Sequence, residues 1–118
     1  MAKYAIHGSY TKESWTAMVG NPEDRSIQAR RLVENVGGKL ESFYWCFGED
    51  DFLVIAELPN DEAAGAISLA VSSSGTGQNV RTTKLITVEE SIAMLMKAKQ
   101  ATAGYAKPGA GSPVASRN

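Results

Sequence analysis

The chain has 118 residues, a net charge of −1, 43% hydrophobic residues and one cysteine. This length and composition fit one domain with a real core and exclude a disordered chain, and the near-neutral charge offers no electrostatic footprint for nucleic acid. There is no signal-peptide core, no apolar run near the roughly 18 residues of a membrane span, and no second cysteine for an internal disulfide, so we expect a cytoplasmic protein that binds neither nucleic acid nor membranes.

The first part of the chain predicts a strand, two helices and a second strand. Residues 3–10 are rich in strand formers. The stretch "TKESWTAMV" follows as a short helix with Thr11 as its N-cap. In "GNPED", Asn21 suits the cap of a longer helix that ends before Gly37, where a left-handed C-cap costs least. A second strand is expected over residues 39–47.

The middle of the chain predicts a hairpin followed by a helix. A turn at Gly48-Glu49-Asp50 leads into a strand over residues 51–58, which Pro59 ends because proline cannot donate to the strand ladder. The next helix, "NDEAAGAISLAVSSSG", is capped by Asn60 or Asp61. We then expect "GTGQN" to be a loop.

The last part predicts one more strand, a final helix and a tail. The strand covers residues 80–86, and Thr87 and Glu90 form a capping box at the start of the helix. Ile92, Leu95 and Met96 are expected to face inward. The domain therefore covers residues 1–103, and the Gly-, Pro- and Ser-rich residues 104–118 are expected to be a disordered tail.

This order of elements is typical of an α+β fold. Strand, helix, strand, strand, helix and strand make the βαββαβ pattern of the ferredoxin-like fold, here with an extra C-terminal helix. Both helices of that fold pack on one face of a four-stranded antiparallel sheet, so the other face of the sheet meets water in a monomer.

The pattern of the two hairpin strands indicates that the second face is also covered. On the third strand, one face carries Phe52, Val54, Ala56 and Leu58, and the other carries Leu53, Ile55 and Glu57. On the second strand, one face carries Phe43, Trp45 and Phe47, and the other carries Leu40, Tyr44 and Cys46. Such an apolar face left in water would form a large exposed patch. We expect a second copy to cover it, giving a homodimer or higher homo-oligomer, and two facing sheets make a dimeric α/β barrel.

The stretches "GGKLESFYWCFGEDDFLVIAELPNDEAA" and "NVRTTKLITVEE" resemble the GYD domain proteins over roughly the first hundred residues. The resemblance implies a dimeric α/β barrel, an architecture shared by cofactor-independent monooxygenases, haem-binding enzymes and ligand-sensing domains. In this chain the family's Gly-x-Tyr-Asp reads Gly48-Glu49-Asp50-Asp51, so Asp50 stands where the tyrosine would be.

Four residues are candidates for lining a ligand site: His7, Trp15, Tyr44 and Glu57. His7 is the one histidine, in a central strand, and is either a hydrogen-bonded structural residue or a ligand contact or general base. Glu57 either reaches water at a strand end, pairs with Arg81 or Lys84, or faces a dry cavity. The aromatic residues either pack in the core or interface or form a binding-site wall. A metal site is not expected, because one histidine has no Cys or His partner.

Three functions remain open from the sequence. The first is a small-molecule-binding homodimer whose ligand, apolar or aromatic with a polar handle, sits between sheet and helices or in the barrel. The second is a cofactor-independent monooxygenase or isomerase in which His7 or Glu57 moves a proton. The third is a structural or partner-binding protein. No cofactor is expected, because dinucleotide, phosphate-loop, haem and zinc motifs are missing from the sequence. Histidine and glutamate converging on one cavity would favour the enzyme, and an uncharged cavity would favour binding.

Overall fold

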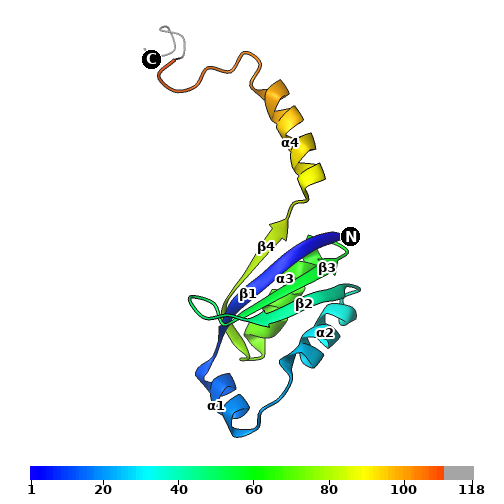
Figure 1. Ribbon diagram of the computed structural model, residues 1–118, viewed down its shortest axis with the longest axis vertical. Coiled ribbons are helices and arrows are strands. Elements are labelled where there is room, and N and C mark those ends of the chain that lie inside the picture. Colours follow the sequence, from blue (N-terminus) through cyan, green and yellow to red (C-terminus); the bar gives the residue numbers. More distant parts are fainter. Residues whose placement is uncertain (111–118) are drawn as a thin grey trace. The chain divides into compact units, whose positions relative to one another are not determined.

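The structure is a computed structural model, and it describes residues 1–110 of the chain. Residues 1–85 form one compact unit and the residues from 86 onward a second. The elements of the first unit are β1 (Ala2–Tyr10), α1 (Lys12–Gly20), α2 (Arg25–Asn35), β2 (Lys39–Trp45), β3 (Phe52–Leu58), α3 (Asp61–Ser73) and β4 (Gly77–Leu85) (Figure 1). No helix among the described residues is long and apolar enough to cross a membrane.

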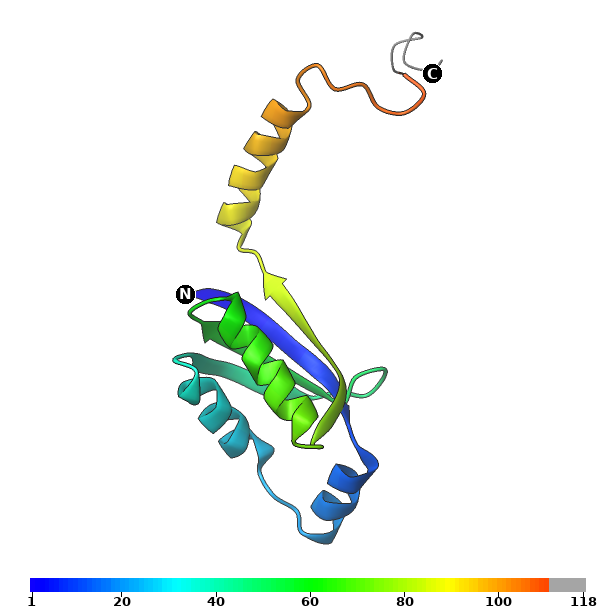
Figure 2. The same ribbon diagram turned by 180° about the vertical axis from the view of Figure 1, so that it is seen from behind.

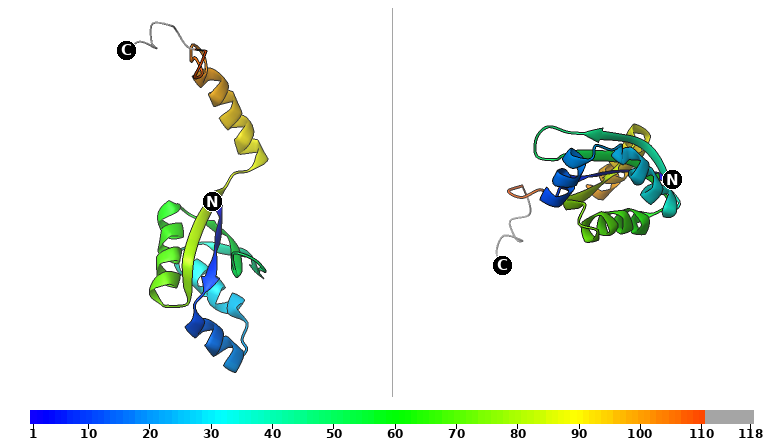
Figure 3. Two further views of the ribbon diagram at one scale, coloured as in Figure 1. Left: turned by 90° about the vertical axis from the view of Figure 1, so that its left-hand side faces the viewer. Right: turned by 90° about the horizontal axis from the view of Figure 1, so that it is seen from below.

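The four strands form one antiparallel sheet in the order β2-β3-β1-β4, with β1 and β3 in its centre. Helix α2 packs against β2 and β3, and α3 packs against β3 and β4. The sheet lies in front of α3 in Figure 1, whereas α3 lies in front of the sheet in the reverse view of Figure 2. Seen along its edge in Figure 3, left, the sheet carries α3 on one side. This topology confirms the ferredoxin-like α+β fold.

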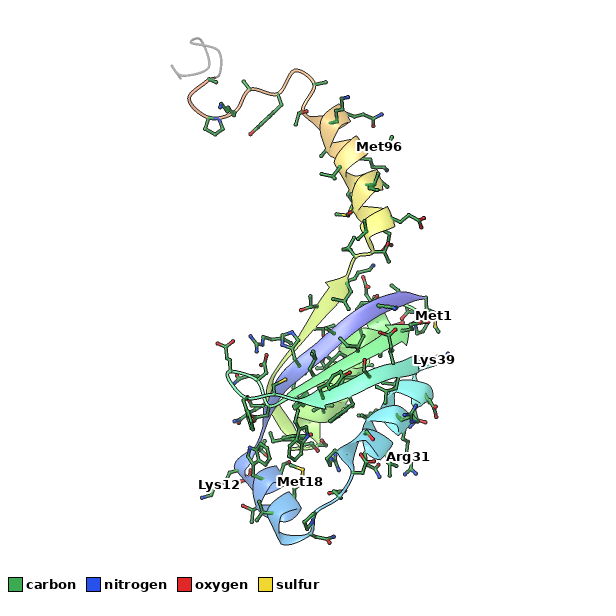
Figure 4. All side chains as sticks on the ribbon, in the orientation of Figure 1. Met1, Lys12, Met18, Arg31, Lys39 and Met96 are labelled. Atoms are coloured by element: carbon green, nitrogen blue, oxygen red, sulfur yellow. The ribbon has the colours of Figure 1, made fainter. Side chains whose placement is uncertain are left out.

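The core lies between the sheet and these helices. Alternate residues of β3 are buried, which confirms that Phe52, Val54, Ala56 and Leu58 share one face of that strand. The largest side chains that are at most 1% exposed come from β1, α2 and β3, and they are Ile6, Val33 and Leu58. Helix α1 contributes Met18, which is labelled in Figure 4. One continuous cluster therefore joins the sheet to α1, α2 and α3.

Two predicted element starts differ from the structure, and β2 ends at Trp45 instead of residue 47. Helix α2 starts at Arg25, because Asp24 rather than Asn21 is its N-cap and accepts a hydrogen bond from the backbone N–H of Ser26 at 2.9 Å. Strand β4 starts at Gly77 inside the expected loop "GTGQN", because Gly77 pairs with Tyr10 at the end of β1. The start of α2 differs because several residues there could serve as the N-cap. The start of β4 differs because that strand pairs with β1, which is far away in the sequence.

Strand β2 contains a β-bulge that changes the predicted faces. Leu40 pairs with Ala56 and Ser42 pairs with Ile55, which leaves Glu41 as an extra residue. Leu40 therefore lies on the helix side and is 7% exposed. The prediction that Leu40 shares the other face with Tyr44 is wrong, because simple alternation cannot include the extra residue.

We call the sheet face opposite α2 and α3 the open face. From the strand register its residues are Lys3, Ala5, His7 and Ser9 of β1, Lys39, Ser42 and Tyr44 of β2, Leu53, Ile55 and Glu57 of β3, and Arg81, Thr83 and Leu85 of β4. Its centre is apolar at Ala5, Leu53 and Ile55, and charged residues lie toward both ends.

Gly38, which precedes β2, lies too close to β3 for any side chain. A Cβ atom there would meet Cδ2 of Leu58 at 2.5 Å and the backbone oxygen of Glu57 at 2.6 Å. We therefore expect Gly38→Ala to lower the free energy of unfolding by about 1–3 kcal/mol, the usual cost of overpacking. Urea denaturation followed by circular dichroism measures this change.

Gly65 on α3 provides the matched control for this substitution. No atom lies within 4 Å of a Cβ built at Gly65. Because alanine favours helix over glycine, Gly65→Ala should raise the free energy of unfolding by about 0.5–1 kcal/mol. Equal stability of the two variants would contradict the packing at Gly38.

The second unit contains α4 (Val88–Ala101), and it is described here by itself. Thr87 and Glu90 form the predicted capping box. Within this unit taken by itself, Ile92, Leu95 and Met96 are 54%, 68% and 66% exposed. That they face inward stays a prediction. Residues 102–110 form turns and irregular structure. Residues 111–118 of the expected tail lie outside the described residues, and the boundary at residue 103 stays a prediction.

Candidate functional site

A cavity of about 60 Å³ lies between the sheet, α2 and α3. Its apolar lining comes from the sheet and from both helices and consists of Ile6, Ala29, Leu32, Val33, Phe43, Phe52, Val54, Ile67 and Val71. Because opposite walls are helices and the floor is the centre of the sheet, these residues are held by the core itself. The cavity is therefore a preformed feature of the fold and not a loop opening.

Four residues of the cavity lining are polar: Tyr10, Arg25, Gln28 and Thr76. Arg25 is the first residue of α2, and 23% of its side chain is exposed. Its Nη1 lies 3.4 Å from Oε2 of Glu23, a long contact with a carboxylate that is itself 44% exposed. Such a pair is weak, since solvent screens it. The guanidinium therefore keeps most of its donor capacity.

Tyr10 is fixed by an aromatic cluster. Its ring lies 5.0 Å from the Trp15 ring, 5.7 Å from the Trp45 ring and 5.1 Å from the Phe52 ring, and the two tryptophans meet edge to face. Its hydroxyl accepts a 3.1 Å hydrogen bond from Nε1 of Trp45. Burial raises the pKa of Tyr10, although the Trp45 hydrogen bond and the charge of Arg25 act to lower it. The phenol is thus neutral and rigidly placed at physiological pH.

The candidate residue Trp15 belongs to this cluster and supports the cavity indirectly. It is half-buried, it packs against Tyr10, and it does not line the cavity. The other three candidates, His7, Tyr44 and Glu57, lie on the open face, on the opposite side of the sheet. The sequence-predicted set is therefore divided between two faces.

His7 is held by hydrogen bonds at both ring nitrogens. Its Nδ1 lies 3.0 Å from Oδ2 of Asp50 in the β2–β3 connection, and its Nε2 lies 3.2 Å from Oγ1 of Thr83 on β4. The ring is 19% exposed and the Asp50 side chain 23%. With Nδ1–H donated to Asp50, Nε2 is the acceptor, which is the tautomer that a general base requires.

Arg81 closes this cluster from the neighbouring strand. Its Nη2 donates to Asp50, and its Nη1 lies 3.4 Å from Oε1 of Glu49. Asp50 therefore contacts one cation and one imidazole at once. This residue replaces the tyrosine expected from the family pattern, and here it anchors the β2–β3 connection to the open face.

Glu57 and Tyr44 do not join His7. His7 pairs with Leu53, whereas Glu57 pairs with Lys3 at the other end of the strands, four residues further along β3. At about 3.3 Å per residue this separation is roughly 13 Å. Tyr44 is 62% exposed on β2. Neither Arg81 nor Lys84 pairs with Glu57; Lys84 lies 3.6 Å from Asp61 instead. Histidine and glutamate thus do not converge on one cavity.

Tyr10 and Arg25, which sequence reasoning did not select, are the polar residues that the fold brings to the cavity. Tyr10 is the last residue of a predicted strand. Arg25 lies in the sequence near Arg30 and Arg31, and the acidic Glu23 and Asp24 precede it, a pattern that also suits a solvated helix face. No short motif joins positions 10 and 25. Within residues 1–110, no group of three or more His, Cys, Asp or Glu side chains could hold a metal ion.

Comparison with known families places this geometry in context. The sequence model of one family, described as GYD domain, matches residues 4–95, which is well over half of the chain. None of the curated proteins compared matches the chain.

Proposed function

The chain belongs to the GYD domain family, and from this premise we propose that it is a small-molecule-binding homodimer whose ligand occupies the cavity between the sheet, α2 and α3. The single observation that carries the proposal is the cavity itself. It has an apolar lining from three strands and two helices and a few polar residues, which include Tyr10 and Arg25. This combination is the usual composition of a small-molecule site.

The residues of the cavity favour binding over catalysis. Its lining includes one ionisable cation, Arg25, and one phenol, Tyr10, and neither a carboxylate nor an imidazole. A guanidinium stays protonated at any physiological pH and cannot act as a general base. The cavity can therefore orient a ligand through its polar end but lacks a group that removes a proton.

The homodimer part of the proposal rests on the open face. Leu53 and Ile55 lie at its centre with Ala5, while Lys3, Glu57 and Arg81 lie toward its ends. An apolar centre with a polar rim is the anatomy of protein interfaces. Covering it with the same face of a second copy makes a two-fold interface and leaves the helix-side cavity of each copy accessible.

Mass spectrometry of extracted small molecules tests ligand binding. Purified full chain is denatured, and the released molecules are compared with those from Ala29→Phe, which places a ring into the cavity from α2. The matched control is Ala66→Phe, at an exposed position of α3 outside the cavity lining.

We expect the wild type and Ala66→Phe to release the same small molecule and Ala29→Phe to lose most of it, because the added ring occupies the ligand's space. Equal release from Ala29→Phe would place the ligand elsewhere and contradict the proposal. The proposal would also be contradicted if the wild type released no small molecule and bound none in solution.

A second candidate function is a cofactor-independent enzyme, and the hydrogen bonds of His7 to Asp50 and Thr83 favour it. In that case Nε2 takes a proton from a ligand in the barrel of the dimer, and Asp50 stabilises the resulting imidazolium. Activity lost in His7→Gln while ligand release is retained would favour the enzyme over binding alone.

A further inference from the structure

The hydroxyl of Tyr10, a residue that lines the cavity, keeps an unused proton. A tyrosine hydroxyl can both donate and accept hydrogen bonds. The hydroxyl oxygen of Tyr10 accepts one from Nε1 of Trp45 at 3.1 Å. Among the described residues no carbonyl or carboxylate accepts the hydroxyl hydrogen of Tyr10. The residue is only 5% exposed, so water reaches this donor poorly. A buried donor without an acceptor costs stability, and a ligand acceptor would recover that cost.

Arg25 lines the same cavity as Tyr10. Its charge and a hydrogen bond from its side chain act to lower the pKa of Tyr10. Two kinds of donor, O–H and N–H, therefore occur in the lining of a cavity that is apolar apart from Tyr10, Arg25, Gln28 and Thr76. Guanidinium groups bind carboxylates bidentately, and hydrogen bonds to charged groups are roughly twice as strong as neutral ones.

The size of the cavity limits the ligand. At about 60 Å³, and with about 10–15 Å³ needed for each water by this measure, it holds on the order of five non-hydrogen atoms. The apolar side chains Ile67, Val71 and Leu32 suit a short hydrocarbon part. The donors at Tyr10 and Arg25 suit an oxygen anion.

We propose that the cavity recognises small organic carboxylates, with the carboxylate on Tyr10 Oη and the Arg25 guanidinium and the hydrocarbon part against α2, α3 and the sheet. This inference rests on the proposed function, since it names the class of ligand for the same cavity. It assigns Tyr10 and Arg25 as specificity residues: they select the anionic head group, and the apolar walls select only size.

The test is an NMR titration of the isotopically labelled full chain with butyrate and, separately, with butyramide. The two probes have the same size and differ in charge. Because charge-assisted hydrogen bonds exceed neutral ones, we expect butyrate to bind at least about tenfold more tightly. The amide signals that shift should belong to Ala29, Val33 and Val71, which line the cavity.

Two variants and one control assign the effect to the named groups. Arg25→Gln and Tyr10→Phe should each reduce butyrate affinity at least several-fold and bring the butyrate-to-butyramide ratio toward one. Arg30→Gln removes the same charge from an exposed position of α2 that does not line the cavity, and it should leave the ratio unchanged. The unchanged dispersion of the spectra shows that each variant is folded.

The outcomes separate this inference from the proposed function. Equal binding of butyrate and butyramide in the cavity would overturn carboxylate recognition and leave cavity binding intact. A butyrate preference that survives in both Arg25→Gln and Tyr10→Phe would overturn the assignment of these residues. Failure of both probes to shift any cavity signal would count against the ligand class and, together with an empty extract, against ligand binding itself.

Discussion

Replacing Phe52 with alanine is expected to lower the free energy of unfolding by about 3–5 kcal/mol, the usual cost of removing a buried aromatic ring. Phe52 is 4% exposed, and its ring packs on Tyr10. The ring also fills the space above two glycines: a Cβ at Gly8 would meet it at 3.2 Å and one at Gly77 at 3.4 Å. Backbone and aromatic neighbours cannot collapse into the space that the ring leaves.

Urea denaturation at low temperature measures this loss, with Phe47→Ala as the control. Phe47 lies in the β2–β3 connection and is fully exposed, so its truncation should change the free energy of unfolding by less than about 0.5 kcal/mol. A loss at Phe52 no larger than at Phe47 would show that the core at the amino end of β3 is packed differently.

Ile55→Lys is expected to convert the proposed homodimer into a monomer. Ile55 lies at the centre of the open face, between Ala5 of β1 and Ser42 of β2. In a two-fold interface the substitution places two lysines near each other. Burying an unpaired charge costs several kcal/mol, which weakens association by at least about a hundredfold. Light scattering during size-exclusion chromatography measures the mass directly.

Leu69→Lys on α3 is the matched control. Leu69 is 72% exposed and lies on the helix side of the sheet, so the variant gains the same charge without touching the open face. It should keep the mass of the wild type. If Ile55→Lys also keeps the wild-type mass, the open face is not the interface and the proposed assembly is wrong.

Local signals in the sequence predicted most of the fold. The caps at Thr11, Asn60 and Thr87 each involve a side chain and a backbone N–H three residues later, and the structure contains all three hydrogen bonds. Such contacts are visible in a short window of sequence. The bulge at Glu41 and the extension of β4 to Gly77 were not predictable in this way, because both depend on a partner strand far along the chain.

The candidate site was less predictable for the same reason. His7 lies in a central strand, as predicted, but its hydrogen-bond partner Asp50 follows 43 residues later in the sequence. The cavity needs Tyr10, Arg25 and Val71 from three separate elements, and each of them alone is typical of an ordinary strand end, helix surface or helix core. Trp15 packs against the ring of Tyr10. Its residue type indicates a large aromatic side chain in the core or at a site, but not which neighbour it supports.

Native mass spectrometry of the unmodified full chain, purified without added ligand, tests the central claim most directly. One spectrum gives both the number of chains in the assembly and the mass of any bound small molecule. The account predicts a species of twice 12.6 kDa that carries a small-molecule adduct and loses it in Ala29→Phe. A single chain at micromolar concentration, or a dimer that never carries an adduct even after incubation with butyrate, would contradict the account.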